Sequence, residues 1–215
     1  MLPTIFLAFL MLAQTTIVPI NNPIQTLGQA QFSLLNRYSN TYVSNVFADN
    51  ILLTMAYMRG IVPNNTPDWT AVKKPFTYSF TLKPNEVFAF HEDVLPQFEG
   101  KVVKTTNAHF GSQEGFKSDG YLVADGVCHL ASLINEAAQN AGLTVVAPTN
   151  HNFAVIPEVD RKYGTAIYFM PGQKGTNQMQ NLYVQNNKDK PVTLTFTYDG
   201  TELKVAATEN VTEQL

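Results

Sequence analysis

The sequence predicts an α+β fold in which two main helices pack on an antiparallel sheet and a β-meander forms the C-terminal part. Apolar residues recur at helical spacing in two segments, residues 31–59 and 127–141. Elsewhere, short runs alternate apolar and polar residues, as half-buried strands do. The second helix stands between two groups of strands rather than in a regular strand–helix alternation. This order favours α+β over a doubly wound parallel sheet.

The N-terminal part of the chain has no charged side chain before Arg37. Residues 2–13 form an apolar run of about 12 residues, which is typical of a signal peptide and shorter than the about 20 residues of a membrane span. No basic residue precedes the run, so a short uncleaved anchor and a buried N-terminal element are alternatives. We expect residues 1–20 to be a signal peptide or short membrane anchor. We expect residues 21–30 to be a linker and residues 31–215 to form a single domain.

The first helix is expected over residues 31–59, because its apolar residues recur every three to four positions or multiples of that spacing. These residues are Leu35, Tyr38, Tyr42, Val46 and Leu53. Gly60 and Pro63 end the helix, and residues 63–75 form a loop. Strands are expected next, at residues 76–80, 87–90, 101–106 and 120–123.

The second helix follows Asp125, whose carboxylate is expected to cap the free backbone N–H groups of the first turn. Its apolar face consists of Val127, Leu130, Ile134, Ala138 and Ala141, and Gly142 ends it. Strands are then expected at residues 143–147 and 152–156. The chain ends in a meander of three strands, at residues 182–185, 192–198 and 203–206.

Composition excludes several classes of function. Charged residues make up 14% of the 215 residues, the net charge is −3, and Lys and Arg do not cluster, so a nucleic-acid-binding protein is not expected. The single cysteine, Cys128, excludes an internal disulfide and a multi-cysteine zinc site. The four histidines have no metal-ligand spacing, and neither a phosphate loop nor a dinucleotide fingerprint occurs. The sequence therefore predicts no metal and no cofactor.

Cys128 is the best candidate for a catalytic residue, because it lies in the first turn of the second predicted helix. Free N–H groups and the helix dipole stabilise an anion there, so the pKa of the thiol is expected to fall toward 7 or below. His151, in a predicted turn between strands, is the candidate base. His129 points about 100° around the helix from Cys128 and is less well placed as its base. A lone cysteine is also commonly a small buried hydrophobic residue, and that alternative stays open.

Several segments resemble motifs of the VanW-domain family, in the family's order. Residues 81–90 (TLKPNEVFAF) resemble its LKPGE-x-FSFN segment, and residues 126–138 (GVCHLASLINEAA) resemble its GGGxCQxSTTLYNAALL segment. Residues 149–152 (TNHN) are similar to its RHNHS, with His151 on a family histidine. Smaller matches are the NI at Asn50 and Ile51, the position of DATV at residues 164–167, and the N-N and P-V pairs at residues 186–187 and 191–192. The resemblance covers about residues 45–206, apart from the loop at residues 61–76.

This resemblance implies an exported cell-envelope protein that acts as an L,D-transpeptidase on peptidoglycan stem peptides. Cys128 would attack the carbonyl of the third residue of a stem, release the terminal D-alanine, and pass the acyl group to an amine of a neighbouring stem. His151 would act as general base and then as general acid. Backbone N–H groups near Cys128 and His129 would stabilise the oxyanion.

Four further residues are expected to support the site, with Asp160 in place of the family aspartate that Gly164 replaces. Asp160 would orient His151, and Glu86, Ser132 and Asn150 lie in the matching motifs and are expected to contact the substrate. The sequence departs from the family at four positions. Ala124 and Asp125 replace two glycines, His129 stands at a glutamine, and Gly164 stands at an aspartate.

Other functions remain open at this point. With water as the acceptor, the same site would be a carboxypeptidase. A domain that keeps the fold without the chemistry would bind stem peptides or partner proteins in the envelope. A metal-dependent amidase is a third and weaker alternative.

Overall fold

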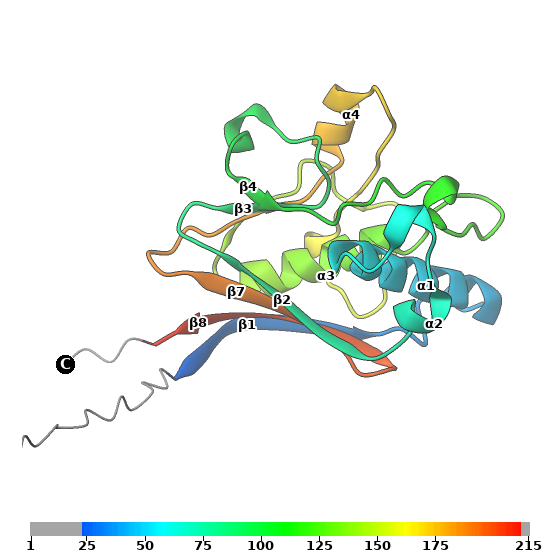
Figure 1. Cartoon of the computed structure of the whole chain (residues 1–215), viewed down its shortest axis with the longest axis horizontal. Helices are drawn as coiled ribbons and strands as arrows, with labels where there is room; N and C mark the ends of the chain where they lie inside the picture. The colour runs from blue at the N-terminus through cyan, green and yellow to red at the C-terminus, as the bar shows by residue number, and fades with distance from the viewer. Residues whose placement is uncertain (1–22, 212–215) are drawn as a thin grey trace, which may run out of the picture.

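The computed structural model of the chain describes residues 23–211 and has eight strands and four α-helices in that range (Figure 1). The strands are β1 Ile24–Ser33, β2 Phe76–Leu82, β3 Val87–Ala89, β4 Val102–Lys104, β5 Thr144–Val146, β6 Tyr183–Gln185, β7 Val192–Tyr198 and β8 Glu202–Asn210. The helices are α1 Thr41–Met58, α2 Trp69–Val72, α3 Val127–Asn140 and α4 Lys174–Met179. The predicted α+β class is confirmed. Among the helices of this range, none has both the length and the apolar character needed to cross a membrane.

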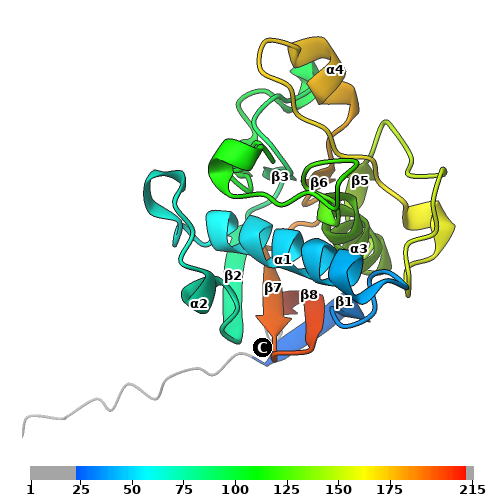
Figure 2. The same ribbon diagram turned by 90° about the vertical axis from the view of Figure 1, so that its right-hand side faces the viewer.

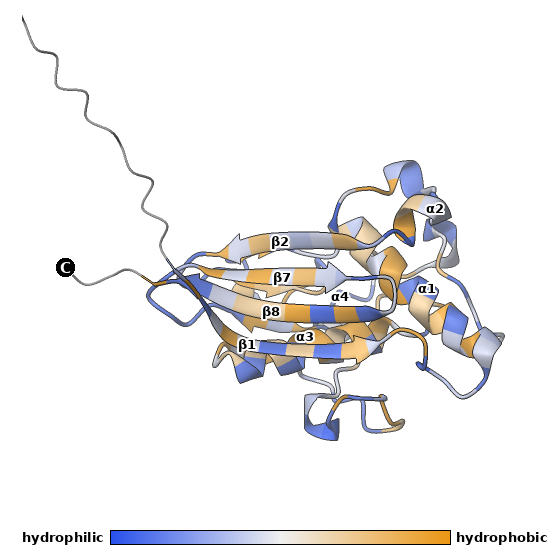
Figure 3. Cartoon of the chain, turned by 90° about the horizontal axis from the view of Figure 1, so that it is seen from below, coloured by the Kyte–Doolittle hydropathy of each residue, from blue (hydrophilic) through white to orange (hydrophobic). Residues whose placement is uncertain are grey.

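The larger sheet is antiparallel throughout, with strand order β1-β8-β7-β2. Along β7 every second residue from Val192 to Tyr198 is buried, and the threonines between them lie on the outer face. Figure 3 views this outer face, where polar and apolar residues alternate along the strands. The same period of two predicted the strands from sequence. The predicted C-terminal meander is confirmed, with β7 and β8 as a hairpin in this sheet and β6 in the second sheet.

The smaller sheet has strand order β4-β3-β6-β5 and is mixed, because β3 and β4 run parallel. In Figure 1 it lies on the opposite side of α3 from the larger sheet. One hydrophobic cluster joins the inner face of the larger sheet to α1, α3 and the smaller sheet. Its members include Phe196, Ile51, Leu130, Phe88 and Val184, all of them fully buried.

The two long helices lie on the inner face of the larger sheet, with α1 crossing in front of α3 in Figure 2. Strand β1 passes beneath the C-terminal end of α3 at Gly28. A Cβ atom on Gly28 would lie 2.3 Å from the backbone nitrogen of Ala141, so glycine is needed where the strand and the helix touch.

The prediction that residues 21–30 form a linker is wrong for residues 24–30, which belong to β1 and pair with β8. The expected first helix is also too long, because residues 31–33 complete β1 and α1 begins only at Thr41. Asn40 sets this start, since its side chain accepts hydrogen bonds from the N–H groups of Tyr42 (2.9 Å) and Val43 (3.3 Å).

Two of the expected strands, at residues 120–123 and 152–156, are loops. The first makes only a single bridge, between Ser118 and Val123. Residues 1–20, expected to be a signal peptide or anchor, lie outside the described residues.

Candidate functional site

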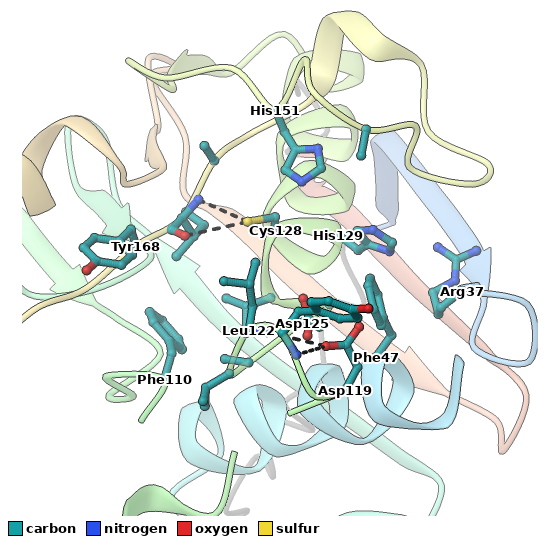
Figure 4. A pocket seen from close by; sticks show the side chains of 18 of the residues that line it. Arg37, Phe47, Phe110, Asp119, Leu122, Asp125, Cys128, His129, His151 and Tyr168 are labelled. Atoms are coloured by element: carbon teal, nitrogen blue, oxygen red, sulfur yellow. Dashed lines mark hydrogen bonds between the residues drawn. The ribbon is translucent and has the colours of Figure 1, made fainter. Parts of the chain in front are cut away.

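A pocket of about 660 Å³ opens beside the N-terminal end of α3 (Figure 4). Its wall combines α1 and the loop before it, residues 119–126, the first turn of α3, and two later segments at residues 151–155 and 166–169. Aromatic and aliphatic side chains dominate this wall, and a few ionisable groups converge among them. Such a combination is typical of sites that bind small molecules or peptides.

Gly126 sets the start of α3 and thereby places Cys128 in the pocket. Its φ is +99°, and a Cβ atom there would lie 2.5 Å from the carbonyl oxygen of Phe47 in α1. Only glycine combines this backbone conformation with such a close approach of two helices. The expectation that Asp125 caps the helix is wrong, because Gly126 is the N-cap and provides no side chain. Asp125 contributes to the pocket wall instead.

Asn50 holds the segment that leads into α3. Its fully buried amide donates to the carbonyl oxygens of Lys117 (3.0 Å) and Asp125 (2.9 Å), and its oxygen accepts from the N–H of Lys117 (2.8 Å). A side chain of α1 thus fixes both ends of the loop that forms one wall of the pocket. The sequence contained a signal for this residue, because Asn50 matches a family motif, but not its role.

Cys128 is a half-buried residue, and its thiol is held by the backbone of Ile167. Its sulfur donates to the carbonyl of Ile167 at 3.7 Å and accepts from the N–H of Ile167 at 3.3 Å. Burial raises the pKa of Cys128 to about 11, and the nearby carboxylate of Asp125 adds to the rise. The expected fall of this pKa toward 7 is therefore wrong. Desolvation by the segments packed over the thiol outweighs the effect of the helix N-terminus.

Alkylation should report this protonated thiol. At pH 8 we expect iodoacetamide to modify the folded protein about 10- to 100-fold more slowly than a free cysteine, whose pKa is about 8.5. The rate should rise about tenfold per pH unit up to about pH 11, as the thiolate fraction grows. Intact-mass spectrometry of the folded protein between pH 7 and 11 measures both effects. An alkylation rate that does not change with pH from pH 7 upward would show that Cys128 is already a thiolate at pH 7. That result would contradict the raised pKa.

Two histidines lie near Cys128 in the pocket. Figure 4 shows the His151 ring pointing toward the first turn of α3, where Cys128 and His129 lie. The ring centroids of His129 and His151 are 6.3 Å apart, and His129 packs on Phe47 at 4.9 Å. Burial lowers the pKa of both imidazoles, that of His129 to about 3 with help from the nearby Arg37. Both rings are therefore neutral at pH 7.

Unpaired polar atoms concentrate at this pocket. Within the described residues, five buried side-chain atoms have no hydrogen-bond partner, and four of them belong to residues of the pocket wall. The four atoms are Arg37 Nε, Asp125 Oδ2, His129 Nδ1 and His151 Nδ1. Buried polar groups in proteins are normally paired, so this cluster indicates a surface that binds polar groups of a ligand. Sequence reasoning missed Arg37, whose only signal was that it is the first charged residue.

Ser132 is buried beneath Cys128 and does not line the pocket. Its hydroxyl donates to the carbonyl of Cys128 (2.7 Å) and accepts from the N–H of Thr165 (2.9 Å). These bonds hold the extended segment that contains Ile167 against α3. Ser132 therefore positions the thiol's neighbours, rather than contacting a ligand in the pocket as the resemblance implied.

Three more of the expected site residues also lie outside the pocket wall. The Glu86 carboxylate accepts from the N–H of Lys83 (2.7 Å) and closes a turn. Asn150 is exposed. The Asp160 carboxylate accepts from the N–H of Lys162 (3.1 Å) at the start of a short 3₁₀ helix, Arg161–Tyr163, so its hydrogen bond goes to the backbone and not to His151.

Of the two backbone N–H groups expected to stabilise an oxyanion, those of Cys128 and His129, only one is available. The N–H of His129 donates to the carbonyl of Gly126 at 3.0 Å and is therefore engaged. Within residues 23–211 no backbone acceptor pairs with the N–H of Cys128, so this group remains as the donor.

The other two histidines lie outside the pocket wall. His91 is fully buried and hydrogen-bonds Asn181. Both ring nitrogens of His109 are engaged, by Glu114 Oε1 at 2.9 Å and by Glu92 Oε1 at 2.7 Å. Neither histidine approaches Cys128 through a hydrogen bond.

Comparison with known proteins gives one finding. The family model described as VanW like protein matches residues 77–208, which include both sheets apart from β1, the first residue of β2 and the end of β8. No match was found among curated proteins, and none among solved structures.

Proposed function

Since the chain belongs to the VanW like protein family, we propose that it is a cysteine acyltransferase acting on peptidoglycan stem peptides. Cys128 is the nucleophile and His151 is the general base. The observation that carries the proposal is their common pocket, whose wall includes the half-buried Cys128 and a neutral imidazole whose Nδ1 has no partner among the described residues. A nucleophile and a base that share one pocket are the groups that covalent catalysis requires.

The reaction begins with a thiol rather than a thiolate. His151 accepts the proton of Cys128 as the sulfur attacks the carbonyl carbon of the third residue of the stem. The N–H of Cys128 donates to the oxyanion of the tetrahedral intermediate. When the C–N bond breaks, His151 returns the proton to the departing amine, so that D-alanine leaves and a thioester remains. An amine of a second stem then attacks the thioester, forms the new amide, and regenerates the thiol.

The neutral state of His151 supports this division of roles. An imidazole whose pKa is lowered by burial accepts a proton at neutral pH, and a thiol whose pKa is about 11 needs such a base. The proton must leave the carbonyl of Ile167, its present acceptor, to reach His151. Catalytic hydrogen bonds commonly tighten only when the substrate is bound.

A non-catalytic role is the second candidate, and the same thiol favours it. The sulfur is saturated by two backbone hydrogen bonds and resists ionisation, as a structural cysteine does. In that case the pocket binds stem peptides or a partner protein without forming a covalent bond.

Both candidates act where stem peptides are found, so we propose an extracytoplasmic location. The apolar segment 1–20 supports it, as a signal peptide or as a membrane anchor.

The test is intact-mass spectrometry of the full chain incubated with a disaccharide-tetrapeptide, alongside Cys128→Ala. We expect a mass gain equal to the donor minus D-alanine in the original protein and none in Cys128→Ala. Released D-alanine is measured in the same tube, because rapid transfer to water would hide the adduct. If several stem types give neither an adduct nor D-alanine, the acyltransferase proposal fails and the binding role remains.

A further inference from the structure

Two buried side chains that carry nitrogen donors, Arg37 and His129, lie to the same side of Cys128 in the pocket (Figure 4). Both residues are more than nine-tenths buried, at 1% and 5% exposure, and both line the pocket. Arg37 comes from the loop between β1 and α1, and His129 from the first turn of α3. Each has one nitrogen without a partner among the described residues, Arg37 Nε and His129 Nδ1.

The other nitrogens of Arg37 are already engaged, so its position is fixed. Nη1 donates to the carbonyl of Pro157 at 3.2 Å, Nη2 pairs with Glu158, and the guanidinium stacks on Phe32 at 4.1 Å. The Nε–H is the donor that remains. Because arginine nitrogens only donate, this atom is available to an oxygen or other acceptor of a ligand.

The part of the pocket wall below Cys128 is acidic. Asp119 and Asp125 belong to its wall, and Figure 4 shows them below Cys128, on the far side from His151. Like charges repel, so these two carboxylates disfavour an anionic group below Cys128. Glu158 balances the charge of Arg37, so attraction there rests on directed hydrogen bonds rather than on net charge.

We propose that Arg37 and His129 form a subsite for a carboxylate, and that this subsite binds the free carboxylate of the residue C-terminal to the reacting carbonyl. The ligand is thus a peptide cleaved at its last bond, not within its length. The carboxylate carbon of that last residue is three bonds from the carbonyl that Cys128 attacks, and Figure 4 shows His129 between Cys128 and Arg37. The inference rests on the proposed function for the identity of the reacting carbonyl. Binding of a carboxylate at the subsite can be measured without any reaction at Cys128.

The test uses the full-length Cys128→Ala protein, which cannot react, and two small probes. N-acetyl-D-alanine carries the carboxylate, and N-acetyl-D-alaninamide replaces it with a neutral amide. We expect the acid to bind at least about tenfold more tightly than the amide, measured by NMR titration with ¹⁵N-labelled histidine. The His129 nitrogen signals should shift with the acid, because a nearby carboxylate favours a donating imidazole.

Two variants locate the subsite. His129→Phe keeps the packing on Phe47 and removes the nitrogen, and Arg37→Met with Glu158→Gln removes the donor without leaving an unpaired buried charge. Either change should abolish the preference for the acid. His109→Gln, outside the pocket wall, is the matched control and should leave the preference intact.

The outcomes separate the two proposals. Equal binding of acid and amide, no binding of either, or a preference that both variants retain would overturn the subsite. If the subsite fails while a stem peptide still forms the Cys128 adduct, the acyltransferase stands alone. If the acid binds selectively but no donor gives an adduct or D-alanine, the subsite stands and the acyltransferase fails.

Discussion

Replacing His151 with glutamine is expected to slow acyl-enzyme formation by about 10²- to 10⁴-fold, the contribution that a positioned general base commonly makes. Glutamine fills a similar space but cannot accept the thiol proton. Because the pKa of the Cys128 thiol is about 11, little thiolate forms at neutral pH without help. The measurement is the initial rate of D-alanine release and of adduct formation by the full-length protein.

The pH profile distinguishes a base from a structural residue. In the original protein the rate should fall only below about pH 6.5, the ordinary pKa of histidine, because burial lowers the pKa of His151. In His151→Gln the rate should instead climb with pH toward 11, as the thiolate fraction of Cys128 grows. His109→Gln, the same substitution outside the pocket wall, should keep the original profile. An unchanged profile in His151→Gln would remove His151 from the mechanism.

Replacing Asn50 with alanine should lower the free energy of unfolding by about 2–4 kcal/mol. The side chain makes three hydrogen bonds, each with a net contribution of about 0.5–1.5 kcal/mol, and its removal leaves the partly buried N–H of Lys117 and carbonyl of Asp125 without this partner. Urea denaturation gives the change directly. Asn187→Ala, at an exposed position, should change the free energy by less than about 0.5 kcal/mol.

The same substitution should loosen the pocket before the whole protein unfolds. Amide hydrogen exchange in residues 117–126 should accelerate in Asn50→Ala, because both ends of that loop lose their hydrogen bonds to Asn50 and only the ion pair between Asp49 and Lys117 still joins the loop's first end to α1. Exchange in β7 and β8, which Asn50 does not contact through hydrogen bonds, should change only with global stability. A loss of stability below 0.5 kcal/mol would mean that other contacts hold the loop in place.

The sequence predicted those helices and strands whose own residues show a clear helical or strand periodicity. The apolar face of α3 and the alternation along β7 and β8 follow periods that a short window of sequence reveals. Strand β1 carries no such signal, because it is uncharged, interrupted by Gly28 and half-exposed. It is a strand because β8, about 180 residues later, offers a free edge.

The candidate site also has features that local sequence predicted and features that depend on distant residues. A cysteine in the first helical turn and a histidine in a family motif were enough to predict that Cys128 and His151 belong together, and the pocket contains both. The pKa of Cys128 was not predictable from its helix position, since the segments that bury it lie far along the chain. Arg37 and Asn50 escaped prediction for a related reason, because their importance comes entirely from partners that are distant in sequence.

The pairing of β1 with β8 has a mechanical consequence. The carbonyl of Pro23 accepts from the N–H of Val211 at 2.8 Å, and the next pair is Ile24 with Asn210. A pulling force applied between residues 23 and 211 would load these hydrogen bonds one after another, as a zipper opens, rather than all together in shear. Such a geometry yields at low force, and rupture would begin at the end of the sheet far from α1 (Figure 1). Peeling would reach Gly28, and with it the support of α3, before it reached the pocket.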